Sequence, residues 1–293
     1  MTKAGRFAPS PSGELHVGNL RTAILAWLFA RSTGRNFLLR VEDLDRARAG
    51  AEAEQLRDLA AIGVTWDGAV VRQTDRGDVY AEAISRLAAA DLTYECFCTR
   101  REIQEAASAP HAPQGAYPGT CRDLDRAELE FKRSTRPAAL RLRSAVTEFA
   151  VRDVLHGGFT GVVDDFVLRR NDGVAAYNLA VVVDDAAQGI DQVVRGDDLL
   201  PSTPRQAYLA SLLGLQVPEY AHVPLVVNSD GVRLAKRDGA VTLGDLALRG
   251  QSAAGVRDLL LASVGLPGGT LEQALAAFDP VALPREPWVW PGA

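Results

Sequence analysis

Two stretches far apart in the chain hold side chains whose types could do chemistry. The first runs from Arg6 to Arg21, RFAPSPSGELHVGNLR, and places His16 and Gly18 directly before an apolar helical pattern. The N-terminus of a helix attracts anions such as phosphate, and glycine lets a ligand approach the backbone closely. The second stretch is the loop NSDGVRLAKRDGA, in which Lys236 would stabilise charge that grows on phosphoryl oxygens. Together the two stretches predict a site for a phosphate-bearing substrate.

A second group of residues suits a small ligand with carboxylate and ammonium groups. Arg6 and Arg195 are expected at the carboxyl ends of strands that face one crevice, and arginine binds carboxylates bidentately. Glu42 follows an apolar stretch and suits an ammonium group, while Tyr177 and Ser10 offer hydroxyl groups. An arginine at the end of a strand also commonly forms a surface ion pair, so these residues alone leave the ligand open.

The three cysteines of the chain are clustered. Cys96, Cys98 and Cys121 are an odd number within a short segment, which argues against a disulfide framework. Three thiolates and one further ligand can form a tetrahedral zinc site. Tyr117 and His111 are rival candidates for the fourth ligand. The alternative is that three reduced thiols pack together in a small subdomain.

Alternating helices and strands must position these residues. The first part of the chain predicts helix 22–33, strand 37–41, helix 51–62 and helix 80–90. This order is typical of a parallel sheet with right-handed crossovers. Short strands, glycines and prolines between about 95 and 165 indicate an insertion. The sheet is then expected to resume with strands at 166–170 and 177–185, followed by helix 203–213, strand 222–227 and a helical end.

Composition bounds the possible partners. The 293 residues are 47% hydrophobic with a net charge of −5, which is ordinary for a globular enzyme. No apolar run approaches the roughly 20 residues of a membrane span, and no N-terminal leader pattern is present, so a cytoplasmic protein without a membrane partner is expected. An RNA partner would need a local basic face, and the candidates are Arg100, Arg101, 132–136, Arg141 and Arg143. The chain contains neither GxxxxGK[ST] nor GxGxxG, so P-loop and dinucleotide-binding folds have no support.

Short motifs give the chain a family resemblance. His16-Val17-Gly18-Asn19 resembles the HIGH motif of class I aminoacyl-tRNA synthetases, and 233–237, RLAKR, resembles their KMSKS loop. The segments RFAPSPSG, VEDLD, AYNLAVVVDD and VVRGDDLL resemble the glutamate branch of that family, in the same order. Arg233 and Ala235 depart from the lysine and serine of the KMSKS pattern, whereas Lys236 holds the place of the lysine that the chemistry most needs.

The resemblance implies a fold and a set of site residues. The fold is α/β, the Rossmann-like nucleotide-binding fold of class I synthetases, split between 1–94 and 166–243. Residues 95–165 would be a zinc-containing insertion similar to an acceptor-stem domain, and 244–293 a short helical region. The implied glutamate ligands are Arg6, Phe7, Ala8, Pro9, Ser10, Glu42, Tyr177 and Arg195. ATP, which normally arrives with Mg²⁺, would meet His16, Gly18, Asn19 and Lys236, with His16 and Lys236 catalytic. One structural Zn²⁺ would be held by Cys96, Cys98, Tyr117 and Cys121.

The length of the chain indicates which members of the glutamate branch it resembles. Residues 244–293 are too few for the anticodon-binding domain of a full-length glutamate enzyme. The chain therefore resembles truncated members of the branch, which implies activation of L-glutamate by ATP without tRNA. The glutamyl group would pass to queuosine in the anticodon of tRNA-Asp, and the protein would act as a monomer. Two alternatives are a truncated glutamyl-tRNA synthetase that charges tRNA-Glu and a non-catalytic RNA-binding relative.

Overall fold

A seven-stranded sheet forms the centre of the molecule. The computed structural model describes residues 3–45, 47–99, 101–103, 117–234 and 241–291. The sheet order is β3-β2-β1-β9-β10-β6-β7, and only β7 runs antiparallel to its neighbour. These strands are β1 (Ala4–Phe7), β2 (Asn36–Val41), β3 (Val71–Arg72), β6 (Glu148–Asp153), β7 (Gly157–Val162), β9 (Ile190–Gly196) and β10 (Glu219–Val223). The predicted α/β architecture with a mostly parallel sheet is confirmed.

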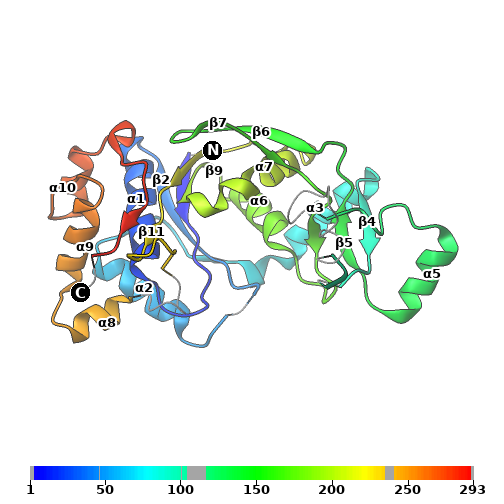
Figure 1. The fold of residues 1–293 in the computed structure, drawn as a ribbon, viewed down its shortest axis with the longest axis horizontal. Helices are drawn as coiled ribbons and strands as arrows, with labels where there is room; N and C mark the ends of the chain where they lie inside the picture. Colours follow the sequence, from blue (N-terminus) through cyan, green and yellow to red (C-terminus); the bar gives the residue numbers. More distant parts are fainter. Residues whose placement is uncertain (1–2, 46, 100, 104–116, 235–240, 292–293) are drawn as a thin grey trace.

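Helix α1 (Val17–Ser32) is the most deeply buried helix of the first half. It packs against β1 and β9 on one side and against α9 and α10 on the other, as Figure 1 shows. Its side chains are therefore buried all round, and it lacks the polar stripe of a surface helix. The other helices are α2 (Ala51–Ala61), α3 (Gly77–Ala89), α5 (Arg126–Thr135), α6 (Tyr177–Ala187), α7 (Thr203–Leu212), α8 (Leu243–Leu248), α9 (Ala253–Ala262) and α10 (Leu271–Ala276). Among the described residues, none of the helices has the length and apolar character needed to cross a membrane.

A smaller antiparallel sheet lies beside the central one. It contains β4 (Thr93–Cys96), β5 (Ala139–Leu142) and β8 (Val167–Arg169), and α5 extends beyond it at the right end of the molecule (Figure 1). The prediction that 166–170 returns to the central sheet is wrong, because β8 pairs with β5. The division into domains stays a prediction. The structure adds that β6 and β7, within 95–165, extend the central sheet through a pairing of Asp153 with Tyr220.

The segment 177–185 is a helix and not the predicted strand. Its apolar run with three consecutive valines is typical of a buried strand, but α6 is enclosed by α3, α7, β8 and β9, so it is apolar on nearly every face. The next central strand is β9.

The predicted strand 222–227 is divided in two. Pro224 separates β10 from β11 (Val226–Val227), and β11 pairs with β12 (Trp288–Val289).

Buried ion pairs attach α6 to the first two strands. The carboxylate of Asp185 accepts hydrogen bonds from Nε and Nη2 of Arg6, both at 3.2 Å, and from Nη1 of Arg40 at 2.7 Å. Burial raises the pKa of Asp185, but Arg6 and Arg40 outweigh this effect and lower the pKa overall. Nη2 of Arg40 also donates to Glu42 at 3.2 Å. Asp185 is thus a structural anchor that ties α6 to β1 and β2.

We expect Asp185→Ala to lower the free energy of unfolding by about 3–5 kcal/mol, because the buried guanidinium of Arg6 loses its carboxylate partner and that of Arg40 loses one of its carboxylates. Urea unfolding followed by circular dichroism measures this. Glu130→Ala is the matched control, since Glu130 and its partner Arg126 form an exposed ion pair on α5 and should contribute little. Equal stability of the two variants would contradict the anchoring role.

Candidate active site

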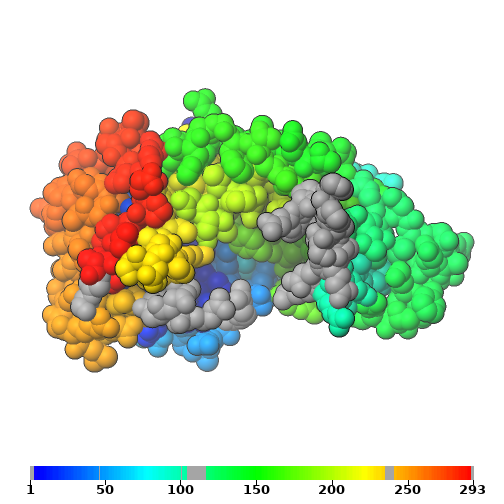
Figure 2. Space-filling view, in the orientation of Figure 1, coloured from blue at the N-terminus to red at the C-terminus, as the bar shows by residue number. Residues whose placement is uncertain are grey.

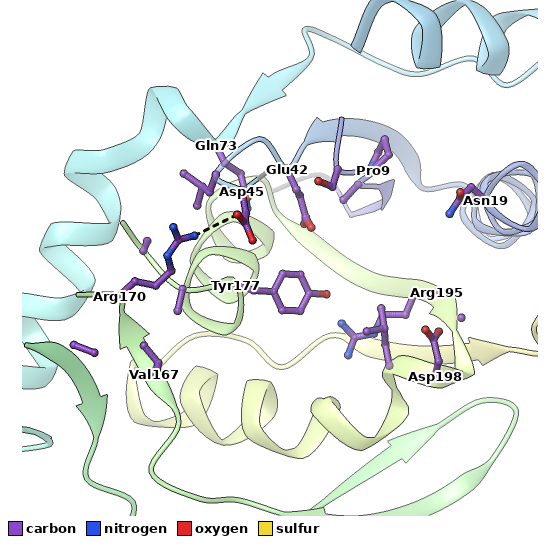
Figure 3. A pocket seen from close by; sticks show the side chains of 18 of the residues that line it. Pro9, Asn19, Glu42, Asp45, Gln73, Val167, Arg170, Tyr177, Arg195 and Asp198 are labelled. Atoms are coloured by element: carbon purple, nitrogen blue, oxygen red, sulfur yellow. Dashed lines mark ion pairs between the residues drawn. The ribbon is translucent and has the colours of Figure 1, made fainter. Parts of the chain in front are cut away.

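A cavity of about 1040 Å³ opens at the carboxyl ends of β1, β2 and β9. Figure 2 shows the recess in the middle of the face, and Figure 3 shows part of its lining. It brings together eleven of the twelve residues predicted to bind glutamate or ATP: Arg6, Phe7, Ala8, Pro9, Ser10, His16, Gly18, Asn19, Glu42, Tyr177 and Arg195. Lys236 lies outside the described residues, and Arg233 from the same loop lines the cavity.

His16 is the N-cap of α1, and its hydrogen bonds define the protonation of the ring. Nδ1 accepts from the backbone N–H of Gly18 at 3.1 Å and of Asn19 at 3.3 Å. A ring nitrogen that accepts cannot carry the proton, so the neutral imidazole carries it on Nε2 and donates from there. Glycine suits position 18, because a Cβ there would lie 3.0 Å from Nδ1 of His16 and would have to displace the ring. The cap therefore presents an N–H donor at a helix N-terminus, which suits an anionic ligand.

The two arginines of the cavity wall are held differently. Arg6 directs Nε and Nη2 to Asp185. Arg195 donates from Nε to Nε2 of His222 at 3.0 Å and from Nη2 to Oγ1 of Thr203 at 2.9 Å. Its Nη1 is buried and has no hydrogen-bond partner within the described part of the chain. Unsatisfied buried donors are costly, so Nη1 is a donor that a ligand could satisfy.

Glu42 and Tyr177 complete this end of the cavity. Burial raises the pKa of Glu42, although Arg40 and Arg6 act in the opposite direction, and a bound ammonium group would favour its charged form. Tyr177 begins α6, and its ring lies between Glu42 and Arg195 in Figure 3. Although 42% of Tyr177 is exposed, the protein around the phenol partly desolvates it and raises its pKa, so it remains a neutral hydrogen-bonding group at pH 7.

The cysteine cluster has the dimensions of a tetrahedral metal site. The Sγ atoms of Cys96, Cys98 and Cys121 all lie within 4.8 Å of one another. The phenol oxygen of Tyr117 lies 3.3 Å from Sγ of Cys96 and 3.5 Å from Sγ of Cys98. Zn–S bonds of about 2.3 Å in a tetrahedron separate the sulfurs by about 3.8 Å, so the donor set fits Zn²⁺. The rival ligand His111 lies outside the described residues.

The surroundings of the cluster favour negative charge on one thiol. Burial raises the pKa of Cys96, but contacts from Tyr117 and Arg141 lower it overall. Burial raises the pKa of Cys98 to about 11. The guanidinium carbon of Arg141 lies 3.6 Å from the centre of the Tyr117 ring, which is a cation–π contact. Arg141 is therefore buried, so the prediction that it belongs to an exposed basic face is wrong.

The residues that hold the two arginines were not predicted from the sequence. The partner of Arg6 is Asp185, which Arg40 also contacts, and the partner of Arg195 is His222, with Asp153 behind it. The sequence does contain a signal for two of these residues. Arg40 and Asp185 are charges within otherwise apolar segments, and a charge buried in an apolar segment requires a partner.

Comparisons with known proteins agree with this site. A family model described as the catalytic domain of class I tRNA synthetases (E and Q) matches residues 4–278. Glutamyl-Q tRNA(Asp) synthetase of Nocardia farcinica is 68% identical over 287 residues, which are 98% of this chain and 92% of the relative. The enzyme of the same name from Cutibacterium acnes is 54% identical over 269 residues, 90% of this chain and 76% of the relative.

A solved structure supports the same relationship. The glutamate tRNA ligase of Elizabethkingia meningosepticum, in complex with its amino acid, superposes with a TM-score of 0.81 at 26% sequence identity. The match covers 97% of this chain and 66% of that ligase, so the present chain spans slightly less than two thirds of its length.

We expect the protein to bind one Co²⁺ per chain with thiolate-to-cobalt absorption that added Zn²⁺ abolishes, because three thiolates converge on one point. Cys121→Ser should weaken the affinity by at least about tenfold, and Tyr117→Phe tests the fourth ligand. Glu95→Gln is the control, since Glu95 is close to the cluster in sequence but pairs with Arg133. Absence of thiolate absorption in the wild-type protein would contradict the metal site.

Proposed function

Because the chain belongs to the class I tRNA synthetases for glutamate and glutamine, we propose that it activates L-glutamate with ATP, independently of tRNA, and transfers the glutamyl group to queuosine in the anticodon of tRNA-Asp. The observation that carries this proposal is the single cavity that joins His16 at the start of α1 to Arg6, Glu42, Tyr177 and Arg195. The two relatives named glutamyl-Q tRNA(Asp) synthetase support the choice of acceptor.

Glutamate recognition follows from charge. The substrate carries two carboxylates and one ammonium group at pH 7. Arg195, whose Nη1 has no partner among the described residues, would bind one carboxylate, and Arg6, which also holds Asp185, would add a second guanidinium group to the same wall. Glu42 and the phenol of Tyr177 suit the ammonium group, and Ser10 adds a hydroxyl group to the same wall. The cavity holds both positive and negative groups. A glutamate analogue that lacks the charge of a carboxylate or of the ammonium group would therefore leave one of these buried groups without its partner.

The activation step needs positioning and charge stabilisation more than covalent catalysis. A carboxylate oxygen of glutamate attacks the α-phosphorus of ATP, and pyrophosphate leaves. Nε2–H of His16 and the N-terminus of α1 donate to the phosphoryl oxygens, while Lys236 would stabilise the charge that grows on the pyrophosphate. Mg²⁺ accompanies ATP and neutralises part of its charge. A queuosine hydroxyl then attacks the activated carbonyl, and AMP is released.

The remaining features of the proposal concern partners. We infer one structural Zn²⁺ at Cys96, Cys98, Tyr117 and Cys121, on the fit of the donor set. We also infer a cytoplasmic monomer, in keeping with ATP and tRNA as substrates.

His16→Asn separates the two roles of this residue. Asparagine also caps helices, so the variant keeps an acceptor for the first N–H groups of α1 but loses the Nε2 donor. We expect glutamate-dependent pyrophosphate exchange to fall about 10²–10³-fold while the melting temperature stays near that of the wild type. His16→Ala should lose about 1 kcal/mol of stability as well. Undiminished exchange in both His16→Asn and Lys236→Ala would defeat the proposal.

The acceptor is tested with labelled glutamate and three purified RNAs. These are tRNA-Asp with queuosine, the same tRNA without it, and tRNA-Glu. We expect label only on the first, retained in the anticodon fragment after nuclease cleavage. Label at the 3′ end of tRNA-Glu would instead identify a truncated glutamyl-tRNA synthetase. Absence of glutamate-dependent ATP consumption would leave a non-catalytic relative.

A further inference from the structure

A row of buried polar side chains crosses three neighbouring strands behind the cavity wall. Arg195 on β9 and His222 on β10 are register partners, and Asp153 ends β6, the next strand in the sheet. The exposed fractions are 6% for Arg195, 0% for His222 and 2% for Asp153. Polar groups are costly at such depth unless their hydrogen bonds are satisfied, so their arrangement in a row needs a physical explanation.

The direction of each hydrogen bond in the row is determined by Arg195. A guanidinium group can only donate, so Nε2 of His222 must accept from Nε of Arg195 at 3.0 Å. The ring proton is therefore on Nδ1, which donates to Oδ2 of Asp153 at 2.6 Å. Asp153 is itself fixed, because Oδ1 accepts from the backbone N–H groups of Leu155 at 2.8 Å and His156 at 3.0 Å. The imidazole is thus held in one tautomer and one orientation.

The charges of the row agree with this assignment. Burial lowers the pKa of His222, and Arg195 and His156 lower it further, whereas the hydrogen bond with Asp153 raises it. The net direction is downward, so the imidazole is neutral at pH 7 and keeps its lone pair for Arg195. Burial raises the pKa of Asp153, but its hydrogen bonds with His222 and the backbone lower it overall. A neutral ring therefore separates a carboxylate from a guanidinium group.

This separation leaves the charge of Arg195 available to the cavity. Arg6 is bidentate with Asp185, so its charge is largely compensated by direct contact. Within the described ranges, Arg195 forms no ion pair with any carboxylate. His222 occupies its Nε and Thr203 its Nη2, while Nη1 has no partner among the same residues. A guanidinium held by two neutral groups is fixed in direction and still able to attract an anion.

We propose that His222, oriented by Asp153, is a positioning residue that directs Nη1 of Arg195 toward a carboxylate of bound glutamate. The inference rests on the proposed function, because it takes glutamate as the ligand of the cavity. It assigns His222 no contact with the substrate and no proton transfer. The role is mechanical and electrostatic, and it acts entirely through Arg195.

Two amide variants of His222 separate positioning from packing. The longer Gln side chain places its carbonyl near the position of Nε2, where it can accept from Arg195. The shorter Asn side chain places its amide near Nδ1, where it can donate to Asp153 but not reach Arg195. We expect His222→Asn to raise KM for glutamate about 10- to 100-fold in pyrophosphate exchange, as loss of a hydrogen bond to a charged group implies. KM for ATP should change less than about twofold, and His222→Gln should recover most of the glutamate affinity.

Several results would overturn the inference. One is an equal KM for glutamate in His222→Asn and His222→Gln, and another is a parallel rise in KM for ATP. Should His222→Asn not fold, Thr203→Val tests the same guanidinium from α7, with Thr203→Ser as its matched control. Only Thr203→Val should raise KM for glutamate, and equal KM values in this pair would also overturn the inference. If the wild-type protein lacks glutamate-dependent exchange, the proposed function fails instead, and with it the ligand assigned to Arg195.

Discussion

The site depends on keeping two buried guanidinium groups in fixed directions at one edge of a sheet. Arg6 and Arg195 lie in the wall of the cavity, with exposed fractions of only 4% and 6%. Charges at this depth are stable only with partners, and the two are partnered in different ways. A helix, α6, supplies Asp185 to Arg6, whereas the neighbouring strand supplies the neutral His222 to Arg195. The first arrangement mainly anchors the fold, and the second leaves charge for a ligand.

The rest of the fold brings other groups to the same edge. The N-terminus of α1 is held there because α1 is packed between the sheet and the C-terminal helices, and this packing places His16 beside the arginines. The cysteine cluster is connected to the same cavity, since Cys96 and Cys98 belong to its lining. A metal at the cluster would therefore stabilise one wall of the cavity in which, on the proposed function, the acceptor nucleoside meets activated glutamate.

Local signals in the sequence were sufficient for the first half of the fold and for the part of the cavity lining that contains Arg6, His16, Glu42, Tyr177 and Arg195. The segment from Arg6 to Glu42 was predictable because its motifs, its turn glycine and its apolar periodicities all agree. Periodicity failed at 177–185, since a helix buried on nearly every face resembles a strand. The partners of the arginines could not be paired from sequence, because Arg6 and Asp185 are 179 residues apart and His222 and Asp153 are 69 apart. Only the packing of α6 against the sheet brings Asp185 to Arg6, and only the order of the strands brings Asp153 to His222.

The most direct test of the account is a crystal structure with a glutamyl-adenylate analogue in which a sulfamoyl group replaces the phosphate. The account predicts that the side-chain carboxylate or its equivalent lies within hydrogen-bonding distance of Nη1 of Arg195. It also predicts that the sulfamoyl oxygens lie at the N-terminus of α1, within reach of Nε2 of His16. An analogue bound away from both arginines, or with its sulfamoyl group remote from His16, would contradict the account.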